Sequence, residues 1–241
     1  NDADHVWMLT DKSETVMRFN TTSGQLSSIT DKNGNTLGLF YTNGILRQIQ
    51  DTAGRSIFLN TNDLGCISDL TDPMGRTIHF EYDANTNLIA AVDAKYQTNW
   101  YFYDVSHQMT NAFDARGTLY IHNEYNPTNF TVFKQHDALT NWTYFSYDFP
   151  NRITYQTNAL GKVSIYSFDD RLLVTNIVDE ATQEQSFAYD DNRNRVYVQD
   201  KNGNETHYSY DERGNVTNKT DALNNVTSIE YDARNNPTRR I

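Results

Sequence analysis

One phrase of sequence recurs about every 21 residues along almost the whole chain. Each copy opens on an acidic turn residue, runs through alternating polar and aromatic residues to a Tyr-Asp pair, and returns through a second short run. A period in this range is typical of repeat proteins, whose units stack and share one continuous surface. The sequence therefore predicts one array over residues 1–241, with residues 1–10 as a lead-in strand. The eleven units open at Asp11, Asp31, Asp51, Asp72, Asp93, Asp114, Asp137, Asn158, Asp179, Asp200 and Asp221.

A central unit, Asp72–Val92, shows what one repeat is expected to form. Its opening residues Asp72–Gly75 have the preferences of a type I turn, with Asp first, Pro second and Gly fourth. Thr77–Tyr82 alternates with period two, which is typical of a strand. Asp83–Asn87 is a second turn, and Leu88–Val92 runs back as the partner strand. Each repeat is thus a β-hairpin, and the chain is predicted to be all-β: a continuous antiparallel meander of about 20 strands whose twist coils it into a curved or spiral sheet, a partial β-shell.

Stacking these hairpins places aromatic residues in columns. We expect rings in adjacent repeats to pack, with about 0.5–1.5 kcal/mol per pair beyond area burial. A lone hairpin is only marginally stable in water, so contacts between repeats must stabilise the array. One column of aromatic residues is therefore predicted to be structural. Its members are Tyr41, Tyr82, Tyr103, Tyr125, Tyr147, Phe168, Tyr189, Tyr210 and Tyr231.

Composition excludes several classes of function. The net charge of −11 is spread along the chain, so binding to a nucleic-acid backbone is not expected. No apolar run approaches the roughly 20 residues that a membrane helix needs, so membrane insertion is not expected either. Cys66 is the single cysteine, which forbids an intrachain disulfide.

The pattern resembles the YD-repeat or RHS-repeat family. The resemblance is carried by Tyr-Asp-x-x-Gly-Asn at Tyr210–Asn215, Asp-Pro-x-Gly-Arg at Asp72–Arg76 and Asp-x-x-Gly-Arg at Asp51–Arg55. It implies a large secreted or cell-surface chain whose repeats wind into a hollow β-shell, as in bacterial polymorphic toxins, insecticidal toxin complexes and teneurins. In the toxin members the shell encloses a C-terminal toxin domain, and nothing after Asp221 looks like such a domain. Departures from the pattern are Phe168-Asp169, Tyr125-Asn126 and Thr61-Asn62.

The chain is expected to be a piece of a longer array. It starts at Asn1 without a Met, and it ends at Ile241, where the period would place the next opening residue one position later. The partners that this predicts are flanking repeats and a cargo domain of the parent chain. Unpaired strands at the two ends also predict self-association through the sheet edges.

No set of residues in the sequence predicts catalysis, a cofactor or a metal. The opening carboxylates are candidates for Ca²⁺ ligands, but we favour turn capping by each Asp, because the dense glycine frame of calcium-binding repeats is missing. The Tyr-Asp carboxylates are candidates for a glycosidase pair, but a repeat singles out no two of them, which favours strand-end roles. His122 and His136 are too far apart in sequence to be counted as a pair, the other histidines show no metal-ligand spacing, and Cys66 lacks nucleophile partners.

The favoured function is therefore that of a structural, non-catalytic segment of a secreted or surface shell. The alternative is a module for glycan binding or adhesion, which would use exposed rings such as Trp7, Trp100 or Trp142. Cross-strand packing is the simpler interpretation of most aromatic residues. Asn-x-Thr sequons, which accept glycans only in a suitable host, lie at Asn20, Asn129, Asn141, Asn204, Asn215, Asn218 and Asn225.

Overall fold

The computed structural model describes residues 6–241, and within them it contains strands and turns without a helix. These residues fall into two compact units. The first ends at Tyr120 and the second begins at Ile121, so the boundary in the sequence lies inside one strand. Because no helix occurs in residues 6–241, none there has the length and apolar character needed to cross a membrane. The all-β prediction is confirmed. Continuity of the array across the boundary between the units stays a prediction.

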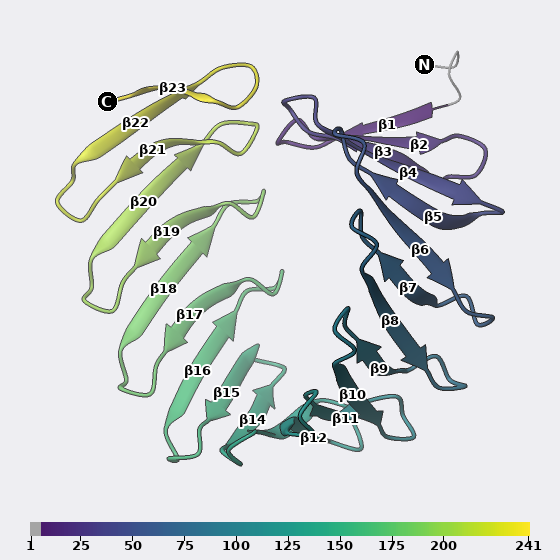
Figure 1. Ribbon diagram of the computed structural model, residues 1–241. Coiled ribbons are helices and arrows are strands. Elements are labelled where there is room, and N and C mark those ends of the chain that lie inside the picture. The colour runs from purple at the N-terminus through teal and green to yellow at the C-terminus, as the bar shows by residue number, and fades with distance from the viewer. Residues whose placement is uncertain (1–5) are drawn as a thin grey trace. The chain divides into compact units, whose positions relative to one another are not determined.

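Successive hairpins stack side by side within each unit (Figure 1). The strands of the first unit are β1 (Val6–Thr10), β2 (Val16–Asn20), β3 (Leu26–Thr30), β4 (Thr36–Thr42), β5 (Ile45–Gln50), β6 (Ser56–Thr61), β7 (Ile67–Thr71), β8 (Thr77–Tyr82), β9 (Leu88–Val92), β10 (Thr98–Tyr103) and β11 (Met109–Phe113). The unit boundary falls inside β12 (Leu119–Tyr125). The remaining strands, all in the second unit, are β13 (Val132–Asp137), β14 (Trp142–Asp148), β15 (Ile153–Thr157), β16 (Val163–Phe168), β17 (Val174–Val178), β18 (Glu184–Tyr189), β19 (Arg195–Gln199), β20 (Glu205–Tyr210), β21 (Val216–Thr220), β22 (Val226–Tyr231) and β23 (Pro237–Arg240).

The strand count follows from the repeat. Eleven units supply two strands each and the lead-in supplies β1, which gives 23 described strands where about 20 were expected. Residues 1–5 of the predicted lead-in lie outside the described residues.

Cross-strand register fixes which residues share a face of the sheet. In β7–β8, Leu70 lies opposite Ile78, and in β8–β9, Phe80 lies opposite Ala91, both antiparallel. Side chains alternate between faces along a strand, so Ile78, Phe80 and Tyr82 lie on one side, which we call the tyrosine face. Beside the second turn of most hairpins the register shifts by one residue, as between Glu81 and Tyr82, whereas β14 and β15 pair without a shift. Such a bulge adds twist beside the turn.

The hydrophobic core is thin. Among the described apolar residues only Leu59, Ala90 and Ala112 are buried, at 5%, 0% and 1% exposure. The other apolar side chains are half-buried or exposed, as expected for stacked hairpins without a covering layer. Stability must therefore accumulate over many half-buried neighbour pairs along the array.

Most turns of both kinds share one backbone, in which the fourth residue donates its N–H to the oxygen of the first and takes a left-handed φ. The turns that open at Asn20 and Asn126 are longer by one residue, and Asn43 and Gly44 form a turn with two left-handed residues. Gly75 takes the left-handed position with a φ of 79°. Thr182 takes the same position in its own turn with a φ of 62°, although a β-branched residue is strained there.

Replacing Thr182 with glycine is therefore expected to stabilise the protein by about 0.5–1 kcal/mol, because relief of the strain exceeds the entropy that glycine adds to the unfolded chain. Urea unfolding of the variant would measure this gain. The matched control is Gly203→Thr at the equivalent position, where φ is 80° and no atom lies within 4 Å of an added Cβ. That change should destabilise by a similar amount, and equal stability of all three proteins would refute the strain argument.

Candidate functional site

The carboxylates that open the repeats accept hydrogen bonds from groups of their own turns. In the turn at Asp72, Oδ1 accepts from the main-chain N–H groups of Met74 and Arg76, both at 2.9 Å. Oδ2 accepts from Arg76 Nε at 2.7 Å. The side-chain bond from Arg76 lowers the pKa of Asp72 below its usual value. The two main-chain bonds to Oδ1 recur at all the other opening turns, including the one at Asn158, so each opening residue caps its turn.

The Tyr-Asp carboxylates have the same role on the opposite edge of the sheet. Asp83 Oδ1 accepts from the main-chain N–H groups of Asn85 and Asn87, both at 2.9 Å, and Oδ2 accepts from Asn87 Nδ2 at 2.8 Å. Sequence reasoning placed these aspartates at strand ends without identifying this shared turn chemistry. Within the described part of the chain, no three His, Cys, Asp or Glu side chains are grouped to hold a metal ion.

The hydrogen bond made by Asn at the fifth position of a turn also explains several of the Asn-x-Thr sequons. Asn204 donates its Nδ2 to Asp200 Oδ2 at 2.9 Å, and Asn225 donates to Asp221 Oδ2 at 2.9 Å. A β-strand begins directly after this position, and its second residue is often Thr. Turn chemistry followed by a β-branched residue in the strand therefore accounts for Asn-x-Thr at these positions. Asn141 and Asn215 hold the same position.

The tyrosines of the predicted column act through their hydroxyl groups. Tyr210 OH donates to the main-chain oxygen of Arg195 at 2.8 Å, and Tyr231 OH donates to that of Val216 at 2.9 Å. The acceptor always lies 15 residues earlier, in the return strand of the preceding hairpin. We call this contact the tyrosine clasp. Four further clasps join Tyr41 to Leu26, Tyr82 to Ile67, Tyr147 to Val132 and Tyr189 to Val174.

The other three column members also end strands. Tyr103 and Tyr125 end β10 and β12, each beside the second turn of its hairpin. Phe168 ends β16 and has no hydroxyl to donate. Nothing in the sequence marked the clasp, because its acceptor is a main-chain oxygen that any residue supplies.

Removing one clasp should have a measurable cost. Tyr210→Phe is expected to lower the free energy of unfolding by about 1 kcal/mol, because a half-buried carbonyl loses its donor. Burial raises the pKa of Tyr210, so the neutral hydroxyl is favoured in the folded state. The stability that this hydroxyl contributes is fully present below the pKa of an ordinary tyrosine and is lost as the pH rises above that pKa. Tyr208→Phe is the matched control, since the side chain of Tyr208 makes no hydrogen bond in the described residues. Equal losses from the two substitutions would contradict the clasp.

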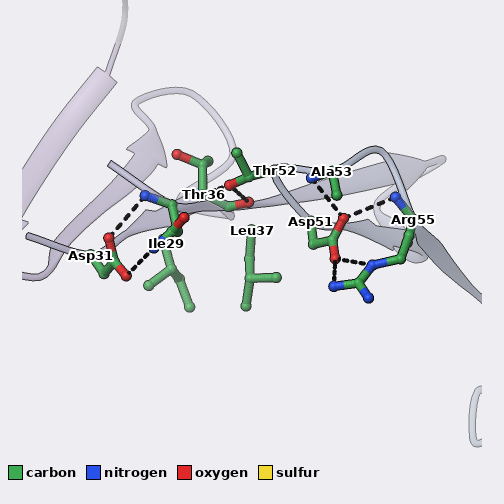
Figure 2. Close-up of a pocket in the computed structure, with 9 residues that line it drawn as sticks. Ile29, Asp31, Thr36, Leu37, Asp51, Thr52, Ala53 and Arg55 are labelled. Atoms are coloured by element: carbon green, nitrogen blue, oxygen red, sulfur yellow. Dashed lines mark hydrogen bonds and ion pairs between the residues drawn. The ribbon is translucent and has the colours of Figure 1, made fainter. Parts of the chain in front are cut away.

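A groove opens between successive opening turns of the first unit (Figure 2). Its volume is about 500 Å³, its floor is formed by Ile29 and Leu37, and its rim carries Asp31 and Asp51. Asp51 is paired with Arg55 at 2.6 Å, and the carboxylate oxygens of both aspartates are bonded within their turns. The groove therefore has an apolar floor and a rim whose carboxylates are already hydrogen-bonded within their own turns. It holds no free nucleophile or acid.

The second unit carries a cluster that does not repeat. Residues of β12, β13 and β14 face each other in register on the side opposite the tyrosine face. We call this the His-Trp cluster: His122, Glu124, Lys134, His136 and Trp142.

Contacts within the His-Trp cluster cover the indole ring. The rings of His122 and His136 stack with centroids 5.0 Å apart, and His136 meets Trp142 edge-on at 4.6 Å. Lys134 Nζ lies 4.3 Å from the Trp142 ring centroid and 2.6 Å from Glu124. The prediction that His122 and His136 are not a pair is wrong, because the hairpin register brings them opposite each other. The pairing could be predicted only from the register of β12 and β13 across the turn Asn126–Thr131, which is longer than most of the other turns.

Trp7 and Trp100 lie far apart within the first unit. Trp7 lies on β1 and is 70% exposed, whereas Trp100 lies on β10 of the same unit and is 43% exposed. Eight strands separate these two. Trp142 belongs to the His-Trp cluster of the second unit and is only partly exposed.

Other candidate residues are dispersed. His79 Nδ1 lies 2.8 Å from Asp69 Oδ1, and His207 packs on Tyr197 with ring centroids 5.1 Å apart. Cys66 is a half-buried free thiol that begins the return from the turn at Asn62, to whose Oδ1 it donates its main-chain N–H. None of these places a nucleophile beside a base.

The comparison with protein families agrees with the turn chemistry and the hairpin order. The family model described as teneurin YD-shell matches residues 5–136, more than half of the 241 residues. The chain belongs to the teneurin YD-shell family. A second model, described as RHS repeat, matches residues 210–241 of this YD-shell chain. The resemblance inferred from the sequence is thus confirmed.

Solved structures share the fold of this YD-shell chain at low sequence identity. The crystal structure of TcdB2-TccC3-Cdc42 matches with a TM-score of 0.59 and 15% identity, over 92% of this chain and 16% of that one. The Photorhabdus luminescens Tc holotoxin pore matches with a TM-score of 0.58 and 14% identity, over 94% and 16%. TcdB2-TccC3 without its hypervariable C-terminal region gives 0.57 and 14%, over 97% and 16%. The chain thus spans about 16% of these proteins, and no curated protein sequence matches it.

Proposed function

We propose that this chain is a non-catalytic wall segment of a secreted or surface YD shell, which encloses or displays a cargo domain of a longer parent protein. The observation that supports this proposal most strongly is the use of the repeated side chains. The Asp carboxylates close turns and the Tyr hydroxyls clasp neighbouring hairpins, as in the bonds of Asp72 and Tyr210. The repeated polar groups thus serve the array itself.

The structural relatives support an enclosing role. One of them is a TcdB2-TccC3 complex that was solved without its hypervariable C-terminal region. A constant wall joined to a variable segment fits a chain in which the repeated polar side chains hold the array together and do not form an active site within one repeat. Flanking repeats and a cargo domain are the partners that this function requires.

Protease protection in the full-length parent protein tests this function. We expect the cargo domain to resist protease in the intact protein and to be cut rapidly when Leu59→Ala weakens the wall. Cargo that is cut equally fast in both proteins would overturn the enclosing role. Turnover of a polysaccharide or RNA substrate that a single Asp→Asn change abolishes would overturn the non-catalytic role.

A glycan-binding role is the second candidate, and one groove supports it. The groove has a volume of about 750 Å³ and is lined by Trp100, Tyr101 and Phe102 together with turn residues that include Asn85 and Asp104. Trp100 and Phe102 are 43% and 50% exposed. Exposed rings beside amide and carboxylate oxygens combine an apolar surface with orienting polar groups, as small-molecule sites do.

Glycan-array binding measures this second role. Trp100→Ala should abolish any glycan signal, while Trp142→Ala, the matched change of a covered indole, should leave it intact. Equal loss from both variants would indicate general destabilisation and would contradict a site at Trp100.

A further inference from the structure

Most of the Asn-x-Thr sequons use their asparagine side chain to hold the fold. The asparagines at the fifth position of a turn donate Nδ2 to the aspartate that opens it, and these are Asn141, Asn204, Asn215 and Asn225. A sugar on one of these nitrogens would replace an N–H group beside the carboxylate and crowd the turn that the bond closes. These asparagines therefore serve their turns.

Two further sequons lie in the strand ladder. Asn218 is half-buried in the middle of β21, opposite Ser228, whose hydroxyl donates to Asn218 Oδ1 at 2.8 Å. Asn20 ends β2, and its Oδ1 accepts from the main-chain N–H groups of Thr22 and Ser23, both at 2.9 Å. Neither asparagine lies in a turn that is free of the ladder.

Asn129 differs from all of these, because it lies within the turn that joins β12 and β13. The N–H of Asn126 donates to the main-chain oxygen of Thr131 at 2.8 Å, and the N–H of Phe130 donates to that of Asn126 at 2.9 Å. Asn126 Oδ1 also accepts from the N–H of Thr128 at 2.9 Å. These bonds close the turn without the side-chain nitrogen of Asn129.

The side-chain amide of Asn129 is held through its oxygen alone. Thr131 donates its hydroxyl to Asn129 Oδ1 at 2.8 Å and its main-chain N–H to the same oxygen at 3.2 Å. Asn129 is exposed, and its Nδ2 makes no hydrogen bond within residues 6–241. No other sequon in the described part of the chain joins the hydroxyl of its threonine to its asparagine. The turn thus fixes the amide and leaves its nitrogen open to solvent.

Transfer of an N-linked glycan requires an accessible nitrogen of this kind. The amide nitrogen attacks the anomeric carbon of a glycosyl diphosphate donor. The new C–N bond replaces the C–O bond to the diphosphate, which leaves with the electron pair, and the nitrogen gives up a proton. The acceptor must be an asparagine with a hydroxyl residue two positions on, in a surface turn that the transferase can reach.

We propose that Asn129 is a site of N-linked glycosylation in the secreted protein. The attachment point lies beyond the ends of β12 and β13, so the ladder between these strands does not have to open for the sugar to fit. The inference goes beyond the wall role and uses only the secretion that the proposed function includes.

Site mapping tests the proposal on the full chain, secreted from a eukaryotic cell behind an added signal peptide. Removal of glycans by peptide N-glycosidase in heavy-oxygen water converts each glycosylated asparagine into a labelled aspartate, which mass spectrometry locates. We expect most secreted molecules to carry the label at Asn129 and few to carry it at Asn204 or Asn225.

Threonine variants separate this sequon from general effects on the fold. Thr131→Ala should abolish the label at Asn129, whereas Thr131→Ser, which keeps a hydroxyl, should retain it. Thr206→Ala is the matched change in the sequon of Asn204 and should leave the label at Asn129 unchanged. An equal loss of that label from Thr131→Ala and Thr206→Ala would contradict the proposal.

Two results of the site mapping would also overturn it. One is a folded, secreted chain without label at Asn129. The other is label spread equally over Asn129, Asn204 and Asn225, because the geometry of the turn would then not select the site. A parent protein whose wall encloses no cargo would refute the proposed function and leave the labelling unchanged, so the two failures are distinguishable.

Discussion

Acidification from pH 7 to pH 2 is expected to destabilise the array strongly. The side-chain hydrogen bond from Arg116 holds the pKa of Asp114 at about 2, well below the ordinary 3.8. Corresponding bonds from Asn204 and Arg76 lower the pKa values of Asp200 and Asp72. A carboxyl group whose folded pKa is depressed stabilises the fold above its unfolded pKa, and that stability is lost as the pH falls through the folded pKa.

The pH window follows from these shifts. Loss should begin at about pH 5, where carboxyl groups of the unfolded chain with an ordinary pKa of 3.8 start to take up protons. It should continue to about pH 2, where Asp114 itself takes up a proton in the folded protein. Most of these carboxylates are half-buried, but solvent still reaches and screens them, so the share of each one is small. The effect is large because the same turn recurs in almost every hairpin. The aspartates with lowered pKa are Asp11, Asp31, Asp51, Asp69, Asp72, Asp83, Asp114, Asp137, Asp169, Asp179, Asp200, Asp211 and Asp221.

Urea midpoints at pH 7, 4, 3 and 2 measure this loss. Asp114→Asn provides the control, because an amide oxygen can still cap the turn but does not titrate. The natural turn at Asn158 supports this choice, since Asn158 Oδ1 accepts from Leu160 and Lys162 at 2.9 and 3.0 Å. The variant should lose less stability between pH 4 and pH 2 than the parent does. A midpoint that stays constant from pH 7 to pH 2 would show that the turn carboxylates do not stabilise the fold.

Leu59→Ala is expected to lower the free energy of unfolding by about 2–4 kcal/mol, a larger loss than removal of one tyrosine clasp. Leu59 is the one large aliphatic side chain that is buried among the described residues, at 5% exposure. It lies opposite Leu70 on the tyrosine face. Truncation would leave a cavity between neighbouring hairpins, where no second layer is present to collapse into it.

Leu64→Ala is the matched control for Leu59→Ala. Leu64 lies in the adjoining turn and is 51% exposed, and its main-chain N–H would keep its bond to Asn62 Oδ1. This change should stay within about 0.5 kcal/mol of the parent in urea unfolding. Hydrogen exchange should place the damage from Leu59→Ala in β6, β7 and the hairpins beside them, because repeat units contact only their neighbours. Equal destabilisation by the two substitutions would contradict a role for the thin core.

The sequence predicted the parts of this structure that local chemistry determines. Asp-Pro-x-Gly at Asp72 specified a turn, and the alternation over Thr77–Tyr82 specified a strand and its faces, both of which are confirmed. Side-chain preferences of turns and the period of two operate over a few residues, so a single unit was enough to identify them.

Contacts that depend on register or on main-chain acceptors were not predictable in the same way. The clasp from Tyr210 ends on a carbonyl of Arg195, and a carbonyl leaves no mark on the choice of residue. The pairing of His122 with His136 required the exact length of the hairpin between them. The covering of Trp142 by Lys134 depended in turn on that register.

The constant 15-residue step of the tyrosine clasp limits how such a gene can change length. Gain or loss of one whole module preserves every hydroxyl–carbonyl match and keeps apolar side chains on their side of the sheet. A single-residue insertion within a strand inverts the side chains beyond it and moves the phenol away from its acceptor. Homologous arrays should therefore differ in copy number mainly by complete modules. The Asp114 unit, in which Tyr125 lies eleven residues after the opening Asp and the turn Asn126–Thr131 is also longer, shows the combined change that such a departure requires.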